Sequence, residues 1–309
     1  MVLRLHVEIV WISRLIKLSS THPHAFGMLV TALGVLVFVP DALLLRLIGG
    51  DMLAVSVWRG FLAGSVFLIW SYGISNAPRT TLRDSLSGLC LLVAVLEGAS
   101  MILFCASIGH TSVSNALFIF ATAPLIAAAL SWVFLRETVP IQTLMAIIVS
   151  MIGVTVIVSG SFGGASLLGD GLAFLNACTV AGFYVALRKI GPKNMLPSIG
   201  AGYVIGAICV MPFAEFQSYS PAQIGYLFVN GAVILPVAIG LLSIGPRYLP
   251  AAEVSMFTVL EVILAPLLVW FVLGENPGGQ SLIGGAIIIS AIFAHTFWRL
   301  RKEQKKNVK

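Results

Sequence analysis

Ten long apolar stretches follow one another along this chain of 309 residues, separated by short segments that carry charges, prolines or glycines. A helix that crosses the hydrocarbon core of a bilayer needs roughly 20 mostly apolar residues, and these stretches meet that length. They are too long for the strands of a membrane β-barrel and lack the apolar/polar alternation of such strands. We therefore expect ten membrane-spanning helices, at residues 25–44, 52–73, 85–107, 112–134, 140–159, 168–187, 197–214, 223–244, 249–273 and 278–298.

The composition leaves no room for a separate soluble domain. Hydrophobic residues make up 59% of the chain and charged residues only 10%, where a soluble domain carries about a quarter charged residues. Most of the formal net charge of +6 lies at expected helix ends and in the tails, so it does not suggest binding to nucleic acid. The chain is predicted to be an all-α, multi-pass membrane protein.

The basic residues indicate an orientation. If both termini lie in the cytoplasm, every Lys and Arg falls on the inner side except Arg46, which is outside, and Arg59, which lies within the second span. We expect a bacterial inner-membrane protein with a cytoplasmic segment at residues 1–24 and a basic cytoplasmic tail at residues 299–309. Residues 1–24 are either an amphipathic surface helix or the product of a misassigned start codon.

The chain contains an internal repeat. Residues 44–64 align with residues 186–206, and residues 132–137 align with residues 270–275. Each copy holds five expected spans, an odd number, so the second copy must cross the membrane in the opposite direction. The prediction is two inverted five-helix repeats, residues 25–159 and 165–298, around a central cavity, an arrangement typical of secondary transporters.

Two pairs of glycines occupy corresponding places in the two copies. Gly60 and Gly64 form a GxxxG motif in the second span, and Gly202 and Gly206 form another in the seventh. This spacing lets helix backbones approach closely, so we assign these glycines to packing and not to a substrate.

The segment YLPAAEVSMFTVLEVILAPLLVWFVLGENP at residues 248–277 and its counterpart at residues 112–139 resemble the drug/metabolite transporter superfamily, and within it the family with paired EamA domains. Residues 40–60 resemble the same family. The resemblance implies ten helices around a central cavity, in a family whose members move amino acids, drugs, vitamins or other metabolites. The family often reads Leu-Glu-Pro where this chain has Leu260, Glu261 and Val262, so we expect the kink beside the glutamate to shift about one turn, to Pro266.

Two carboxylates are the first candidates for the site. Glu97 lies near the centre of the third span and Glu261 near the centre of the ninth, so each repeat supplies one carboxylate at the depth where such transporters bind substrate. Either residue can carry a proton or meet an ammonium group. For Glu97, a protonated carboxyl that is bonded to a neighbour is an equal alternative.

Other polar residues in the spans are further candidates. Ser255 and Thr258 share a helix stripe with Glu261, and Glu253 lies two turns earlier on nearly the same side. This stripe either faces the cavity or forms a hydrogen-bonded seam between helices. Arg59 and Asp41 either form a structural ion pair, or Arg59 receives a substrate carboxylate or phosphate.

A third set of residues is expected to line the pathway with hydrogen-bonding or aromatic groups. Asn176 and Thr179 share one face of the sixth span with Phe183, and Asn115 shares a face of the fourth with Thr122. Five aromatic residues in the spans either contact an aromatic or partly apolar ligand or pack between helices. They are Trp58, Phe104, Phe120, Tyr184 and Tyr203. His295, near the inner end of the last span, is expected at the membrane interface.

Motifs for other functions are absent from the sequence. It has no HExxH zinc motif, no Walker A motif and no CxxC pair, so we expect no metal and no cofactor. An integral-membrane enzyme, a receptor and a structural membrane protein are the alternatives. The favoured prediction is a non-enzymatic secondary transporter, monomeric or homodimeric in the lipid bilayer, that exports a small metabolite such as an amino acid and couples this export to protons.

Overall fold

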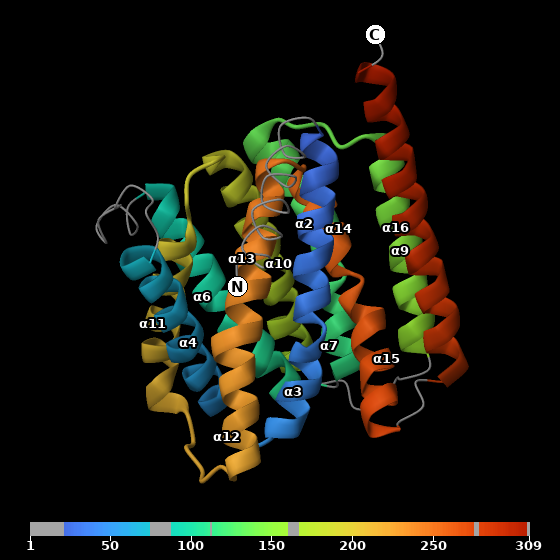
Figure 1. Cartoon of the computed structure of the whole chain (residues 1–309). Helices are drawn as coiled ribbons and strands as arrows, with labels where there is room; N and C mark the ends of the chain where they lie inside the picture. Colours follow the sequence, from blue (N-terminus) through green and yellow to red (C-terminus); the bar gives the residue numbers. More distant parts are fainter. Residues whose placement is uncertain (1–21, 75–87, 112, 160–166, 275–277, 308–309) are drawn as a thin grey trace, which may run out of the picture.

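The computed structural model describes residues 22–74, 88–111, 113–159, 167–274 and 278–307, and all regular elements in these ranges are helices (Figure 1). The α-helices are α2 (Pro23–Phe38), α3 (Pro40–Ile48), α4 (Met52–Ile69), α6 (Gly88–His110), α7 (Val113–Phe120), α8 (Ala123–Leu130), α9 (Ile141–Ser159), α10 (Leu167–Ile190), α11 (Leu196–Val210), α12 (Pro221–Phe228), α13 (Leu235–Ile244), α14 (Ala251–Thr258), α15 (Glu261–Leu273) and α16 (Gly278–Asn307). Short π- or 3₁₀-helical segments extend some of them: η1 (Trp70–Ile74), η2 (Ser131–Leu135), η3 (Met211–Phe213), η4 (Val229–Ile234) and η5 (Gly245–Arg247).

Each predicted span coincides with one helical segment or with a consecutive set of them. Among the described residues, eight helical segments are long and apolar enough to cross a membrane. Two shorter apolar helices, Ala123–Leu135 and Ile141–Val156, fall in the fourth and fifth predicted spans. The multi-pass helical architecture is therefore confirmed, and the count of ten spans stays a prediction.

The first helices of the two repeats run in opposite directions. Phe26, at the start of α2, packs edge-on against Tyr248 with 5.1 Å between the ring centroids. Arg188, at the end of α10, donates a hydrogen bond to the carbonyl of Pro246 at 3.3 Å. α2 therefore begins at the end of the bundle where α10 ends, which is the upper end in Figure 1 and also carries the C-terminus. The repeats have the inverted orientation that their sequences predict.

Glycines bring α4, α6 and α11 into backbone contact. A Cβ atom added at Gly64 of α4 would lie 2.9 Å from the carbonyl oxygen of Gly200 on α11. One added at Gly202 would lie 2.8 Å from the carbonyl carbon of Ala94 on α6. The remaining glycines of this seam are Gly60, Gly98 and Gly206. The predicted packing role of the two GxxxG motifs is confirmed.

The fourth and ninth predicted spans are each broken near the middle. α7 gives way to α8 at residues 121–122, and α14 gives way to α15 at residues 259–260. These are corresponding places in the two repeats. Pro124 follows the first break within one turn, whereas no proline follows the second break before position 266.

The break in the ninth span arises from hydrogen bonding in its backbone. The N–H of Val259 donates to the carbonyl of Met256 at 3.2 Å, three residues back instead of four. The hydroxyl of Thr258 donates to the carbonyl of Ser255 at 2.7 Å, which satisfies the acceptor that Val259 would otherwise use. The predicted shift of the kink to residue 266 is wrong, because α15 continues through that position and the break directly precedes Glu261.

Candidate functional site

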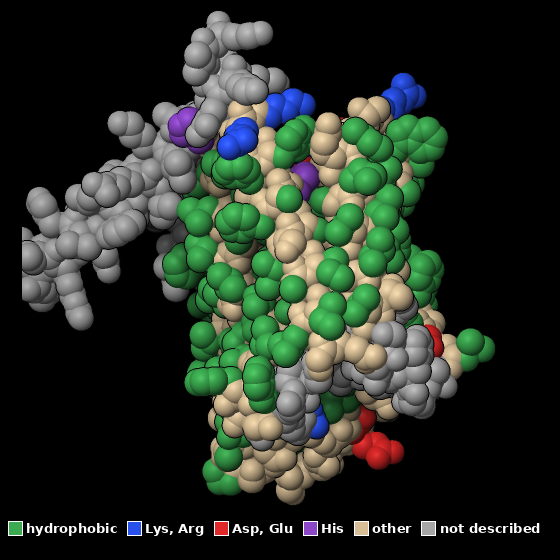
Figure 2. Space-filling model, turned by 90° about the vertical axis from the view of Figure 1, so that its right-hand side faces the viewer, with side chains coloured by type: hydrophobic (Ala, Val, Ile, Leu, Met, Phe, Trp, Pro, Cys, Tyr) green, Lys and Arg blue, Asp and Glu red, His purple; other side chains and the backbone are tan. Residues whose placement is uncertain are grey.

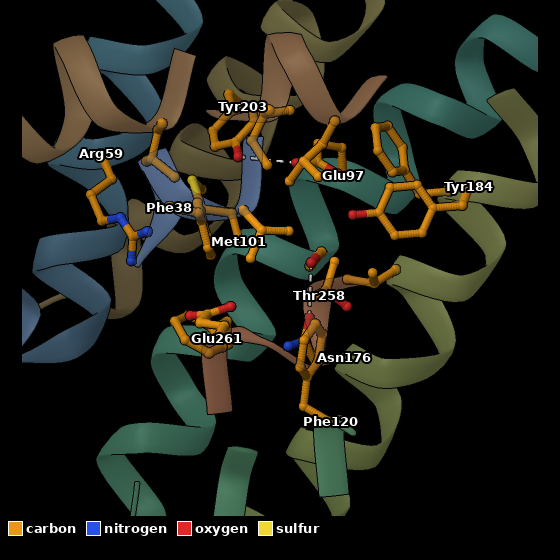
Figure 3. A pocket seen from close by; sticks show the side chains of 18 residues that line it. Phe38, Arg59, Glu97, Met101, Phe120, Asn176, Tyr184, Tyr203, Thr258 and Glu261 are labelled. Atoms are coloured by element: carbon orange, nitrogen blue, oxygen red, sulfur yellow. Dashed lines mark hydrogen bonds between the residues drawn. The ribbon is translucent and has the colours of Figure 1, made fainter. Parts of the chain in front are cut away.

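A cavity with a volume of about 70 Å³ lies at the contact between the two repeats (Figure 3). Its wall comes from α2, α4, α6 and α7 of the first repeat and from α10, α11, α13, α14 and α15 of the second. The lining residues are Val35, Phe38, Arg59, Glu97, Ser100, Met101, Phe104, Phe120, Asn176, Val180, Phe183, Tyr184, Tyr203, Leu235, Ile239, Leu242, Thr258 and Glu261.

The cavity is small. A single water needs at least about 10–15 Å³ of such volume, whereas pockets for small molecules measure roughly 300–1,000 Å³. In this structure the cavity therefore has room for a few waters and not for a metabolite.

The two predicted carboxylates meet in this cavity but have different surroundings. Glu97 of α6 accepts a hydrogen bond from the hydroxyl of Tyr203 on α11 at 3.0 Å. Glu261, the first residue of α15, is 2% exposed, and its Oε1 atom has no hydrogen-bond partner among the described residues. Figure 3 shows Glu97 and Glu261 at separate places on the cavity wall. Glu261 is thus the carboxylate that is open to a new partner.

Arg59 and Asp41 form the ion pair that was one of the two alternatives. Arg59 Nη2 lies 2.7 Å from Asp41 Oδ1, and both side chains are buried. The amide of Asn230 donates to the same Asp41 oxygen at 2.8 Å, and Arg59 Nη1 donates to Cys105 Sγ at 3.1 Å. Arg59 lines the cavity, and Asp41 lies behind it as its counter-ion.

A glycine allows this cluster to assemble. Gly231 follows Asn230 in the π-helical segment η4, and a Cβ atom there would lie 2.9 Å from Leu62 Cβ and 3.4 Å from Arg59 Cα. The absence of a side chain lets η4 approach α4 closely beside the ion pair. Asn230 can therefore reach a carboxylate that belongs to the other repeat.

Amide and hydroxyl groups complete the polar part of the wall. Ser100 of α6 donates a hydrogen bond to Oδ1 of Asn176 on α10 at 2.8 Å, which joins the two repeats across the cavity. Thr258 lines the cavity beside the helix break. Figure 3 shows Asn176 and Thr258 on neighbouring parts of the wall.

Six of the ten candidate residues line the cavity, three described ones, Asp41, Ser255 and Thr179, do not, and one falls outside the described part of the structure. Ser255 is fully buried and is not part of the wall, so only Thr258 and Glu261 represent the predicted stripe. The hydroxyl of Thr179 donates back to the carbonyl of Asn176 at 2.8 Å, within its own helix. Asn115 lies on α7, and its side chain is outside the described part of the structure.

One further expectation from the sequence is wrong. Glu253 does not extend the stripe, because it lies at the upper end, 3.0 Å from His24 Nε2 and in an ion pair with Arg299. His295 was expected at the membrane interface, and its depth stays a prediction, but its side chain is 4% exposed and packs against α9, where its Nε2 lies 2.9 Å from the hydroxyl of Thr143.

Four of the five aromatic candidates line the cavity, and the fifth does not. Phe104, Phe120, Tyr184 and Tyr203 line the cavity. Trp58 lies on the outer surface and packs edge-on against Phe216, with 6.5 Å between ring centroids. Most of the wall is thus apolar or aromatic, with a few polar groups that converge on it.

Sequence reasoning missed the residues that contact the candidates from other helices. Asn230 holds Asp41, Ser100 holds Asn176, and Cys105 contacts Arg59. Asn230 and Ser100 are polar residues inside predicted spans, which is the same signal that selected Asn176. Within the described ranges, no three His, Cys, Asp or Glu side chains gather in a way that could hold a metal ion.

Known proteins resemble this chain over most of its length. An Archaeoglobus fulgidus protein named an uncharacterised transporter is 26% identical over 258 residues, which is 80% of this chain and 87% of that protein. The riboflavin transporter of Vibrio cholerae is 24% identical over 252 residues, covering 78% of this chain and 82% of the relative. One solved crystal structure has the same fold, with a TM-score of 0.74 at 16% identity over 87% of this chain and 98% of that one.

The family assignment rests on matches in both repeats. The family model described as EamA-like transporter matches residues 25–159 and again residues 167–297. Together these ranges cover nearly the whole helical bundle, including every described residue that lines the cavity. The chain therefore belongs to the EamA-like transporter family.

Proposed function

We propose that this protein is a secondary transporter that moves a small metabolite across the membrane by alternating access, with ten spans that surround the cavity. Family membership, the inverted orientation of the repeats and a small cavity at their contact support this proposal. A riboflavin transporter among the relatives supports transport of a small organic molecule in general. Its own substrate is not carried over to this chain.

The observation that carries the proposal is the isolation of Glu261. An ionised carboxylate in an apolar, buried position costs several kcal/mol unless a cation or hydrogen-bond donors compensate it. Arg59 is already paired with Asp41, and Glu261 Oε1 has no partner among the described residues. Glu261 therefore binds either a proton or a cationic group of the substrate. Exchange of one for the other would couple transport to protons.

The wall of the cavity suits an amino acid or a related amine. Glu261 offers a carboxylate for an ammonium group, and the aromatic residues offer contact for an apolar side chain. Arg59 also faces the cavity, and its Nε atom lacks a partner in the described structure, so it can attract a substrate carboxylate. We infer an amino acid or related metabolite as the substrate class.

The distribution of charge supports an orientation. The basic residues at the upper end include Arg136, Arg188, Lys189, Lys193, Arg247, Arg299, Arg301 and Lys302. The lower end carries Arg46 with Asp51, Asp170 and Glu215. By the positive-inside rule the upper end, and with it the C-terminus, faces the cytoplasm of a bacterial cell. Export is the proposed direction.

The first test compares metabolites in medium and cytoplasm between a deletion strain and strains that overexpress the parent protein or Glu261→Gln. The parent protein is expected to move one metabolite from the cytoplasm to the medium, and Glu261→Gln to lower that flux at least tenfold. Glu215→Gln is the matched control, because Glu215 is exposed at the lower end and should leave the flux unchanged.

A second measurement tests the coupling. The purified protein in liposomes should accumulate the metabolite in response to an imposed pH gradient, and Glu261→Gln should retain counterflow exchange while it loses this response. Accumulation that continues undiminished in Glu261→Gln would exclude Glu261 as the proton carrier. If no metabolite moves despite correct insertion, the transporter proposal itself fails.

A further inference from the structure

A second cavity lies on the outer face of the bundle, between α9 and α16. It is a groove with a volume of about 860 Å³, and its wall is almost entirely apolar. α9 contributes Ile141, Gln142, Met145, Ala146 and Val149, and α16 contributes Ile283, Ala286, Ile287, Ser290, Ala291, Ala294, His295 and Trp298. Figure 2 views the molecule from this side and shows hydrophobic side chains over most of the face.

The dimensions of the groove fit an acyl chain. On α16 it extends from Ile283 to Trp298, which is roughly 22 Å at about 1.5 Å per residue. One leaflet of a bilayer contributes about 15 Å to the hydrocarbon core. Small residues form its floor on α16, at Ala286, Ser290 and Ala294, so a chain can lie close to the helix backbone.

The upper end of the groove carries positive charge. Arg301 and Lys302 follow Trp298 within about one helical turn, and both are exposed. Arg301 stacks over the ring of Phe297 and Lys302 over the ring of Trp298, at 4.2 Å and 5.2 Å from the ring centroids. In the part of the chain that the structure describes, neither forms an ion pair. Figure 2 shows Lys and Arg side chains gathered at the upper end of this face.

A buried polar group also borders the groove. His295 is 4% exposed and lines the groove, and its Nδ1 atom has no hydrogen-bond partner among the described residues. Its Nε2 atom is engaged by the hydroxyl of Thr143. When Nε2 accepts that hydroxyl proton, Nδ1 carries a hydrogen and needs an acceptor. His295 lies nearly two helical turns, roughly 10 Å, below the basic residues.

We propose that the groove between α9 and α16 is a binding site for one anionic phospholipid. An acyl chain lies along the small residues of α16, and the phosphate meets Arg301 and Lys302. Exposed basic residues beside a membrane surface attract anionic headgroups. A second copy of this chain would fit poorly, because a twofold contact through this face would bring the basic residues of both copies together.

The proposal can be tested on the purified full-length protein in phosphatidylcholine nanodiscs that contain a few mole per cent of a photoactivatable phospholipid. We expect phosphatidylglycerol with a photoreactive acyl chain to label peptides of α9 and α16 at least fivefold more than the matching phosphatidylcholine probe. Ala294→Trp fills the groove and should lower this labelling at least fivefold. Ile205→Trp, on the exposed face of α11, is the matched control and should leave it unchanged.

A second variant keeps the test decisive if Ala294→Trp fails to fold. Arg301→Gln with Lys302→Gln changes only exposed residues and should reduce phosphatidylglycerol labelling to the level of phosphatidylcholine. Lys189→Gln with Lys193→Gln removes the same charge from the same end and should preserve the preference. Three results would overturn the proposal. Phosphatidylglycerol labelling could stay unchanged in Arg301→Gln with Lys302→Gln, or it could fall equally in both double variants. The third is that the groove forms cross-links between two protein chains instead of cross-links to lipid.

Discussion

The ion pair between Asp41 and Arg59 gives a prediction whose size follows from burial. Asp41 is 0% exposed and Arg59 is 2% exposed, and Asp41 Oδ1 accepts bonds from both Arg59 and Asn230. Asp41→Asn removes one charge without a large change in shape and leaves the guanidinium uncompensated. Loss of one partner of a buried pair costs about 3–5 kcal/mol. We expect the lower figure, about 3 kcal/mol, because the asparagine oxygen can still accept a hydrogen bond.

The measurement is the unfolding temperature of the purified protein in detergent. For a chain of this size 1 kcal/mol corresponds to roughly 2 °C, so Asp41→Asn should lower the unfolding temperature by about 6 °C. Arg59→Gln alone should lower it similarly. The double variant carries no buried charge at this place, and its loss should be much smaller than the sum of the two single losses.

Asp51→Asn is the matched control for this cycle. Asp51 accepts hydrogen bonds from the N–H groups of Leu53, Ala54 and Glu215, and asparagine still caps the helix but keeps only one of the two acceptor oxygens. Asp51→Asn should lower the unfolding temperature by no more than about 2 °C, well below the change for Asp41→Asn. A single Asp41→Asn variant as stable as the parent, or losses that simply add in the double variant, would refute the reasoning.

Two further substitutions test contacts around the cavity. Gly202→Ala would place a carbon atom against the backbone of α6 and should destabilise the protein by about 1–3 kcal/mol. Gly225→Ala is the control, because its new carbon atom enters open space and should not lower the unfolding temperature. Equal effects of the two variants would contradict the close packing at Gly202. Tyr203→Phe removes the hydroxyl that donates to Glu97 and should cost about 1–3 kcal/mol, against less than about 0.5 kcal/mol for Tyr226→Phe, again measured by thermal unfolding. No difference between the two tyrosine variants would mean that the buried hydrogen bond contributes nothing.

Features that depend on local sequence could be predicted well. The helical segments follow from the length of each apolar stretch, and the pairing of Arg59 with Asp41 follows from the short turn between the first two predicted spans. The glycine contacts follow from spacing, because residues four apart lie on one face of a helix. None of these inferences needs knowledge of which distant helices are neighbours.

The errors arise where a regular helix was assumed. The stripe from Glu253 to Glu261 was extrapolated with one constant helical period, but the break at residues 259–260 lies within it, and Glu253 binds groups at the upper end instead. The contact of His295 with Thr143 could not be predicted either, because the sequence does not show that α9 packs against α16.

The missed contacts depend on tertiary structure. Asn230 reaches Asp41 across 189 positions of sequence and from the other repeat, and only the assembled bundle shows that these helices are neighbours. The polarity of Asn230 marks it as unusual in an apolar span, but it does not indicate the partner.

The glycine seam of α4, α6 and α11 has a mechanical consequence. Main-chain atoms in contact have no rotamers to change, so these helices cannot slide past one another by a helical turn without driving a side chain into a carbonyl group. The three helices, which come from both repeats, are therefore expected to stay together in the proposed alternating access. An opening to either side of the membrane would then come from the helices across the cavity, where α2, α13 and the broken α14–α15 pair supply part of the wall.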